Sequence, residues 1–128
     1  MKNDNMIKLH IPGESFWAER LTENTARVEN ILLDFSIGLN DIVLFNQENE
    51  VLEVIQKNSK SVMLKYANEP DTVRENYAKI YEYFKGHRIG CEGMFAGEAL
   101  LSLPIELSDI EFEIIASKCP VEIEIVES

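Results

Sequence analysis

One stretch decides the fold, and it reads Thr72-Val-Arg-Glu-Asn-Tyr-Ala-Lys-Ile-Tyr-Glu-Tyr-Phe-Lys-Gly86. Four of its apolar side chains recur at spacings of three or four residues, which places them on one face of an α-helix: Val73, Tyr77, Ile80 and Phe84. Thr72 and Glu75 have the spacing of a capping box, and Gly86 is typical of a helix end. The stretch therefore predicts an amphipathic helix.

The residues on either side of this helix predict strands. Strand composition occurs at 62–66, 88–91 and 99–105, and apolar and polar residues alternate at 121–125. A second helix lies between the last two of these strands in the chain. The resulting order, strand-helix-strand-strand-helix-strand, is typical of a ferredoxin-like unit, in which two helices cover one face of a four-stranded antiparallel sheet.

The second helix is predicted from a capping box formed by Ser108 and Glu111. Ile110 and Ile114 are four residues apart, so we expect both to face inward, with Ile115 as a further candidate. Pro120 ends the helix, because proline cannot continue a helical hydrogen-bond ladder.

Residues 1–58 predict a small β-barrel. Short segments with strand character are separated by turn residues, and they fall at 7–11, 14–19, 26–31, 42–45 and 51–55. Five short strands at regular spacing favour an SH3-like barrel. The expected fold class is thus α+β, with an SH3-like barrel over 1–58 and a ferredoxin-like half over 59–128, packed together as one compact unit.

Three segments of the first half carry a resemblance: 14–19, 26–31 and 38–43. They are similar to an uncharacterised bacterial family of small domains with an N-terminal ESxWA motif. The sequence departs from the family pattern at 32–35, where the family has a proline-aromatic stretch, and at Asn40, where a glycine is expected. The resemblance covers nearly the whole chain. It implies a bacterial origin and a fold, and it carries over no catalytic residue.

Composition excludes several classes of function. The formal net charge of −11 at pH 7 repels phosphate backbones, so we expect no nucleic-acid partner. No apolar run approaches the ~20 residues that cross a bilayer, and the N-terminus lacks the apolar stretch of a signal peptide. We therefore expect a cytoplasmic protein without membrane association, and two reduced structural thiols at Cys91 and Cys119.

Candidate catalytic patterns are few. Glu14 and Glu19 would lie on opposite faces of a strand, too far apart for paired acid–base work, so a solvated strand edge accounts for them better. If the chain is extended between them, His87 lies about 13 Å from Cys91, beyond the reach that a thiolate nucleophile needs. The glycines of 90–97 lack a phosphate-binding lysine and lie between two strands, which favours a hairpin loop. We expect no catalytic residue, cofactor or metal site.

Acidic residues are the feature that points to a partner. They are concentrated in the C-terminal half, and Glu122 and Glu124 share one side of the last strand. We expect recognition of a basic protein surface through acidic residues and the tip of the hairpin loop: Glu111, Glu113, Glu122, Glu124, Met94 and Phe95. The leading hypothesis is a non-enzymatic acidic protein-binding module, and one form of it is an immunity or antitoxin-like protein that covers a basic toxin.

Two alternatives remain open. A small-molecule sensor or minimal enzyme would use the groove between the two halves, lined by four candidate residues: Trp17, Tyr77, Tyr81 and His87. The other is a structural subunit of a larger assembly. For Trp17 itself, we expect burial in the barrel core or at the domain interface more than ligand stacking.

Overall fold

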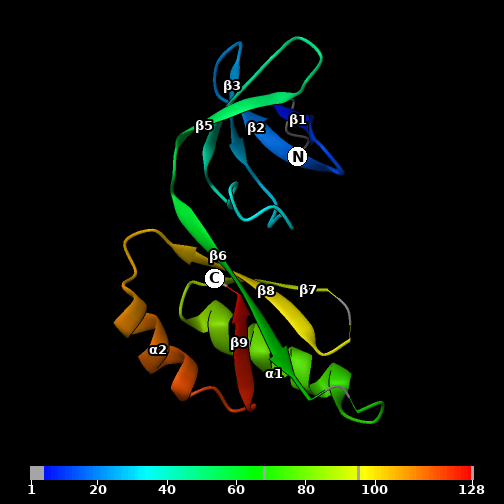
Figure 1. Ribbon diagram of the computed structural model, residues 1–128, viewed down its shortest axis with the longest axis vertical. Coiled ribbons are helices and arrows are strands. Elements are labelled where there is room, and N and C mark those ends of the chain that lie inside the picture. The colour runs from blue at the N-terminus through cyan, green and yellow to red at the C-terminus, as the bar shows by residue number, and fades with distance from the viewer. Residues whose placement is uncertain (1–4, 68, 95, 128) are drawn as a thin grey trace. The chain divides into compact units, whose positions relative to one another are not determined.

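The computed structural model describes residues 5–67, 69–94 and 96–127, without the side chain of Glu127. The chain divides into two compact units, Met1–Lys60 and Ser61–Ser128, each with its own hydrophobic core (Figure 1). The described residues form a mixed structure of two antiparallel sheets and two helices.

The N-terminal unit is one five-stranded sheet whose strands follow one another in chain order. Its members are β1 (Met6–Ile11), β2 (Glu14–Arg20), β3 (Thr25–Val28), β4 (Ile42–Phe45) and β5 (Val51–Gln56). Each neighbouring pair is antiparallel. Gly13, at a φ of 83°, forms the tight turn between β1 and β2. Glycine adopts this conformation at little energetic cost because it has no side chain.

Alternation along these strands builds the first core. Phe16 and Ala18 of β2 are buried while Trp17 between them is exposed, as the period of two predicts. Leu9 of β1 and Val43 of β4 are fully buried in the same cluster. The predicted division of 14–19 into two faces is therefore confirmed.

The first and last strands of this sheet approach each other at one end. His10 bridges to Glu50, and the His10 N–H donates to the Asn49 carbonyl over 2.8 Å. The remaining lengths of β1 and β5 form no ladder among the described residues. The sheet thus curves back on itself at a single bridge.

The C-terminal unit has the predicted order of strands and helices. It contains β6 (Ser59–Tyr66), α1 (Val73–Gly86), β7 (Gly90–Gly93), β8 (Glu98–Pro104), α2 (Asp109–Ser117) and β9 (Ile123–Glu127). The strands lie in the sheet order β7-β8-β6-β9. The β7–β8 and β6–β9 pairs are antiparallel.

Both helices pack on the same side of this sheet. One buried cluster unites Ile80 and Phe84 of α1 with Phe112 of α2, together with Leu64 of β6 and Leu101 of β8. The apolar face predicted for 73–86 is therefore confirmed.

Two expectations about the helices are wrong. Thr72 precedes α1 with φ −124° and ψ −11°, outside the extended region that directs an N-cap side chain back to the helix, and it makes no side-chain cap. On α2, Ile110 and Ile114 are 71% and 52% exposed, whereas Phe112 is 7% exposed. The larger aromatic ring, and not the isoleucine pair, faces the core.

The capping box at the start of α2 is confirmed. The Ser108 hydroxyl accepts the Glu111 N–H over 3.1 Å, and the Glu111 carboxylate accepts the Ser108 N–H over 3.2 Å. These two hydrogen bonds satisfy backbone donors that the first turn leaves free. Among the described residues, no helix is long and apolar enough to cross a membrane.

Candidate functional site

The outer face of α2 exposes two large apolar side chains. Ile110 and Ile114 lie one turn apart on the same side of the helix, and both point to solvent. Glu113, next to Ile114 in the chain, is also exposed. An apolar pair beside carboxylates is a surface that a protein partner can bury, whereas scattered single apolar residues need no explanation.

The predicted acidic residues do not share one surface. Ile123 packs against the core beneath the helices, so the alternation of β9 turns Glu122 and Glu124 to the opposite side of the sheet. There they line a shallow pocket of about 250 Å³ with Lys65 and Tyr66. The α2 carboxylates and the β9 carboxylates therefore face different directions.

Glu111 has a structural task. Its carboxylate is the acceptor in the capping box, and the hydrogen bonds from the Ser108 hydroxyl and backbone lower its pKa. Replacing it would alter the helix start as well as the surface charge. Glu113, which has no such role in the described structure, is the better probe of recognition.

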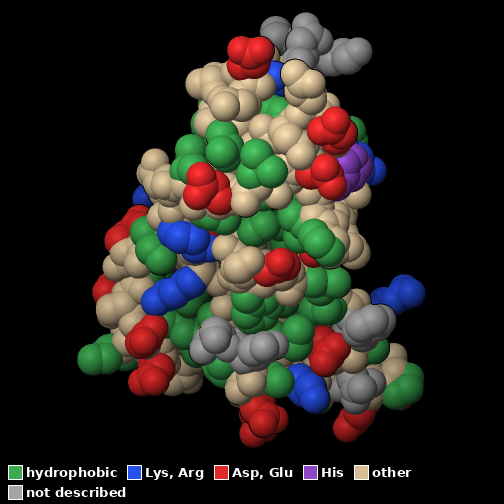
Figure 2. All heavy atoms as spheres, turned by 45° about the horizontal axis from the view of Figure 1, so that its top comes forward, with side chains coloured by type: hydrophobic (Ala, Val, Ile, Leu, Met, Phe, Trp, Pro, Cys, Tyr) green, Lys and Arg blue, Asp and Glu red, His purple; other side chains and the backbone are tan. Residues whose placement is uncertain are grey.

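Figure 2 shows how charge is distributed on one face of the molecule. The acidic side chains there stand singly or in small groups among hydrophobic and neutral ones, instead of filling a continuous patch. Negative charge on this face is therefore dispersed among apolar and neutral side chains.

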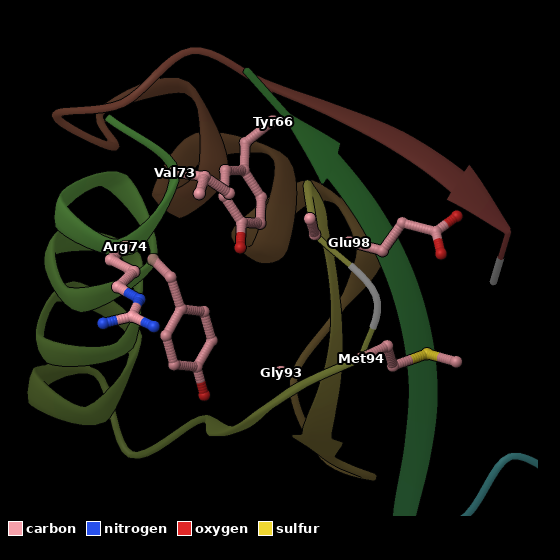
Figure 3. A pocket seen from close by; sticks show the side chains of 8 residues that line it. Tyr66, Val73, Arg74, Gly93, Met94 and Glu98 are labelled. Carbon is pink, nitrogen blue, oxygen red and sulfur yellow. The ribbon is translucent and has the colours of Figure 1, made fainter. Parts of the chain in front are cut away.

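A second candidate site is a pocket within the C-terminal unit, of about 310 Å³. It lies between the start of α1, the end of β6 and the β7–β8 hairpin (Figure 3), and is lined by Tyr66, Val73, Arg74, Tyr77, Gly93, Met94, Ala96 and Glu98. Met94 is thus partly buried at a pocket wall. Phe95, the other residue predicted at the hairpin tip, lies outside the described residues.

The hydroxyl groups around this pocket are held in their neutral form. Burial raises the pKa of the Tyr66 and Tyr77 hydroxyls, and it raises the pKa of the Cys91 thiol to about 11. Tyr77 also hydrogen-bonds to Cys91, and this contact lowers the Cys91 pKa and so opposes part of the effect of burial. Neutral phenols and a neutral thiol can donate hydrogen bonds but are poor nucleophiles at pH 7.

The four residues predicted to line a groove have different surroundings. Tyr77 alone among them lines the pocket described above. Tyr81 is exposed beneath the Lys85 ammonium, and the His87 ring contacts the Tyr83 ring at 4.8 Å between centroids. His87 and Cys91 therefore have separate aromatic neighbours, Tyr83 and Tyr77.

Trp17 corrects an expectation. Its side chain is 47% exposed on β2, so a position in the barrel core is wrong. The Lys8 ammonium lies 5.6 Å from the ring centroid, and the backbone N–H of Trp17 donates to the side-chain oxygen of Asn30 over 2.7 Å. Trp17 lies on the outward side of β2 because its neighbours Phe16 and Ala18 take the inward side.

The flanking glutamates also have structural partners. Glu14 accepts the Leu33 N–H over 3.0 Å, and Glu19 forms an ion pair with Arg27 at 2.7 Å. These contacts hold the long β3–β4 connection and the β2–β3 pair, so the predicted solvated strand edge is too simple an account. Among the described residues, no group of three or more His, Cys, Asp or Glu side chains could hold a metal ion.

Comparison with family models, with curated proteins and with solved structures finds no match to this chain. Function must therefore be argued from the two surfaces themselves. Sequence reasoning missed Tyr66 and Arg74 as pocket residues, and it assigned Ile110 and Ile114 to the core. The only available signal for α2 was the surplus of apolar residues over the number that one helical stripe can bury.

Proposed function

We propose that this protein is a non-enzymatic protein-binding module, and that the outer face of α2 binds a partner with an apolar groove and a basic rim. The observation that carries the proposal is the exposure of Ile110 and Ile114 beside the acidic side chain of Glu113. Burying a large aliphatic side chain contributes roughly 1.5–3 kcal/mol, so two of them can anchor an interface.

Negative charge sets the chemistry of the partner. The chain carries 23 acidic against 12 basic residues, and electrostatic attraction by such a surface speeds association with a basic protein. An immunity or antitoxin-like role, in which the module covers a basic surface of a toxin, is the form of this function that we favour. Glu122 and Glu124 would contribute through the long-range field, because they lie away from α2.

The finer fold assignment belongs to the same proposal. The strand order β7-β8-β6-β9, with both helices packed on one core, supports a ferredoxin-like arrangement for the C-terminal unit. The five-stranded meander with its His10–Glu50 bridge supports an SH3-like barrel for the N-terminal unit. Membership of the bacterial family with the ESxWA motif rests on the resemblance in residues 14–43.

The test has two stages. Partners captured from the native host with the wild-type chain are identified, and binding of the purified partner is then measured by titration calorimetry. Ile110→Ser combined with Ile114→Ser should weaken binding by at least about tenfold, because both apolar anchors are lost. Glu113→Gln should reduce the salt dependence of association.

A matched control distinguishes specific binding by the α2 face from non-specific hydrophobic binding. Leu52 on β5 is another exposed aliphatic residue, so Leu52→Ser should leave affinity unchanged. Equal affinity of the wild type, the Ile110/Ile114 variant and the Leu52 variant would refute the proposal. Unfolding curves of all variants exclude loss of structure as the cause.

A further inference from the structure

The pocket between α1 and the β7–β8 hairpin has features beyond protein binding. Two tyrosine rings lie at its edges, and each lies close to one end of the hairpin. The Tyr66 backbone N–H donates to the Gly97 carbonyl over 2.9 Å, and the Gly97 and Gly93 backbones act on the Tyr66 and Tyr77 hydroxyls, where they oppose part of the rise in pKa that burial causes. A pocket wall built from residues already in contact reduces the entropic cost of binding.

Gly93 leaves room for this arrangement because it has no side chain. A Cβ atom at this position would lie 3.2 Å from the Tyr77 ring, closer than side chains normally approach. The absence of a side chain therefore lets the Tyr77 ring lie against the hairpin backbone. The tyrosine and the glycine together form one wall of the pocket.

Arg74 brings a positive charge to the α1 side of the pocket, one turn before Tyr77. It lies in the first turn of α1, its side chain is exposed, and it forms no ion pair with any residue that the structure describes. In Figure 3 the Tyr66 ring extends into the space between α1 and β8, and the Arg74 guanidinium lies along α1 at the edge of that space, while Met94 and Glu98 extend away from it. A guanidinium with free donors matches a carboxylate in geometry and charge.

The rest of the lining is mainly apolar, and the carboxylate of Glu98, which also lines the pocket, extends away from it in Figure 3. Val73, Ala96 and the faces of the two tyrosine rings border a volume of about 310 Å³, at the small end of the range for ligand pockets. Tyrosine rings favour stacking against a flat, unsaturated group. The pocket is therefore too small for a nucleotide-sized ligand to be enclosed and suits a single ring.

From these observations we infer that the pocket binds a small aromatic carboxylate, with its ring against Tyr66 and Tyr77 and its carboxylate on Arg74. The Tyr66 hydroxyl, which is neutral because burial raises its pKa, donates a hydrogen bond to the same carboxylate. This binding site is independent of the α2 face, so either proposal can fail without the other.

Three probes of equal size and different charge test the inference: benzoate, benzamide and benzylamine. Each is titrated into the full chain while the backbone amide signals of Gly93 and Gly97 are followed by NMR. Benzoate should produce saturable shifts at both glycines, with an affinity at least about tenfold greater than that of neutral benzamide. Equal binding of benzoate and benzamide, or stronger binding of benzylamine, overturns the inference.

Two variants locate the binding groups. Arg74→Gln removes the cation and should weaken the binding of benzoate by about tenfold, while the affinity for benzamide stays unchanged. Tyr66→Phe removes one donor and keeps the ring, so it should weaken benzoate by a smaller factor. Lys79→Gln, an exposed position elsewhere on α1, has the same change of charge and should have no effect. Benzoate binding that is insensitive to Arg74→Gln, or equally sensitive to Lys79→Gln, also overturns it.

Discussion

Asp41 and Lys57 form an ion pair in which the Asp41 side chain is completely buried and the Lys57 side chain stays 39% exposed. The Asp41 carboxylate also accepts backbone N–H groups from Gly38, Asn58 and Ser59 at 2.7–3.1 Å. One buried side chain thus joins the turn before β4 to the segment that follows β5. The burial of a charge is tolerated here because every face of the carboxylate meets a donor.

Replacing Asp41 should therefore destabilise the N-terminal unit. Asp41→Asn removes the charge and turns one acceptor into a donor that faces other donors, so the free energy of unfolding should fall by about 3 kcal/mol. Urea unfolding monitored by circular dichroism measures the change. Glu48→Gln, an exposed carboxylate on the β4–β5 turn, serves as the control and should be nearly neutral. A change below about 1 kcal/mol for Asp41→Asn would contradict this role.

The orientation of α2 can be tested by stability alone. Phe112→Ala removes a ring from the core and should cost about 3–5 kcal/mol, whereas Ile110→Ser changes a side chain that is 71% exposed and should cost less than about 1 kcal/mol. Thermal unfolding of the two variants provides the comparison. If Ile110→Ser proved the more damaging change, the helix would have the orientation predicted from the isoleucine spacing.

The capping box of α2 should make stability depend on acid pH. Ser108→Ala removes the acceptor for the Glu111 N–H and should cost about 1 kcal/mol at neutral pH. Because hydrogen bonds from the Ser108 side chain and backbone lower the pKa of Glu111, the stabilisation is present above the unfolded pKa and is lost as pH falls through the folded pKa.

Unfolding measured between pH 7 and pH 3 tests this sign. The difference in free energy of unfolding between wild type and Glu111→Gln should shrink as the pH falls, since protonation removes the charge that the variant already lacks. A difference that stayed constant or grew toward acid pH would show that the carboxylate charge is not what stabilises the helix start.

Cys91 should be unreactive in the folded protein. With a pKa of about 11, its thiolate fraction at pH 8 is roughly 100-fold smaller than that of an ordinary cysteine, so alkylation should slow by a similar factor. Iodoacetamide labelling of the Cys91 peptide, followed by mass spectrometry, measures the rate, and the same chain in urea is the control. Tyr77→Phe should slow labelling further, because it removes a hydrogen bond that lowers the Cys91 pKa. Labelling as fast in the folded chain as in urea would contradict the burial of this thiol.

Local patterns in the sequence determined the secondary structure. The face of residues 73–86 and the two sides of 14–19 follow from the periods of 3.6 and 2, which depend only on backbone geometry. The capping box of Ser108 and Glu111 is equally local, since its two hydrogen bonds close within four residues. Thr72 and Glu75 have the same spacing, yet the backbone angles of Thr72 prevent the cap.

The tertiary structure alone decided which apolar residues of α2 face the core and which residues meet in the pocket. Helix α2 carries apolar residues at 110, 112, 114, 115 and 116, so several stripes were available, and contact with the sheet selected the one that buries Phe112. Tyr66, Arg74 and Gly93 lie on three separate elements. Their approach depends on contacts between distant parts of the chain, and periodicity along one segment carries no information about such contacts.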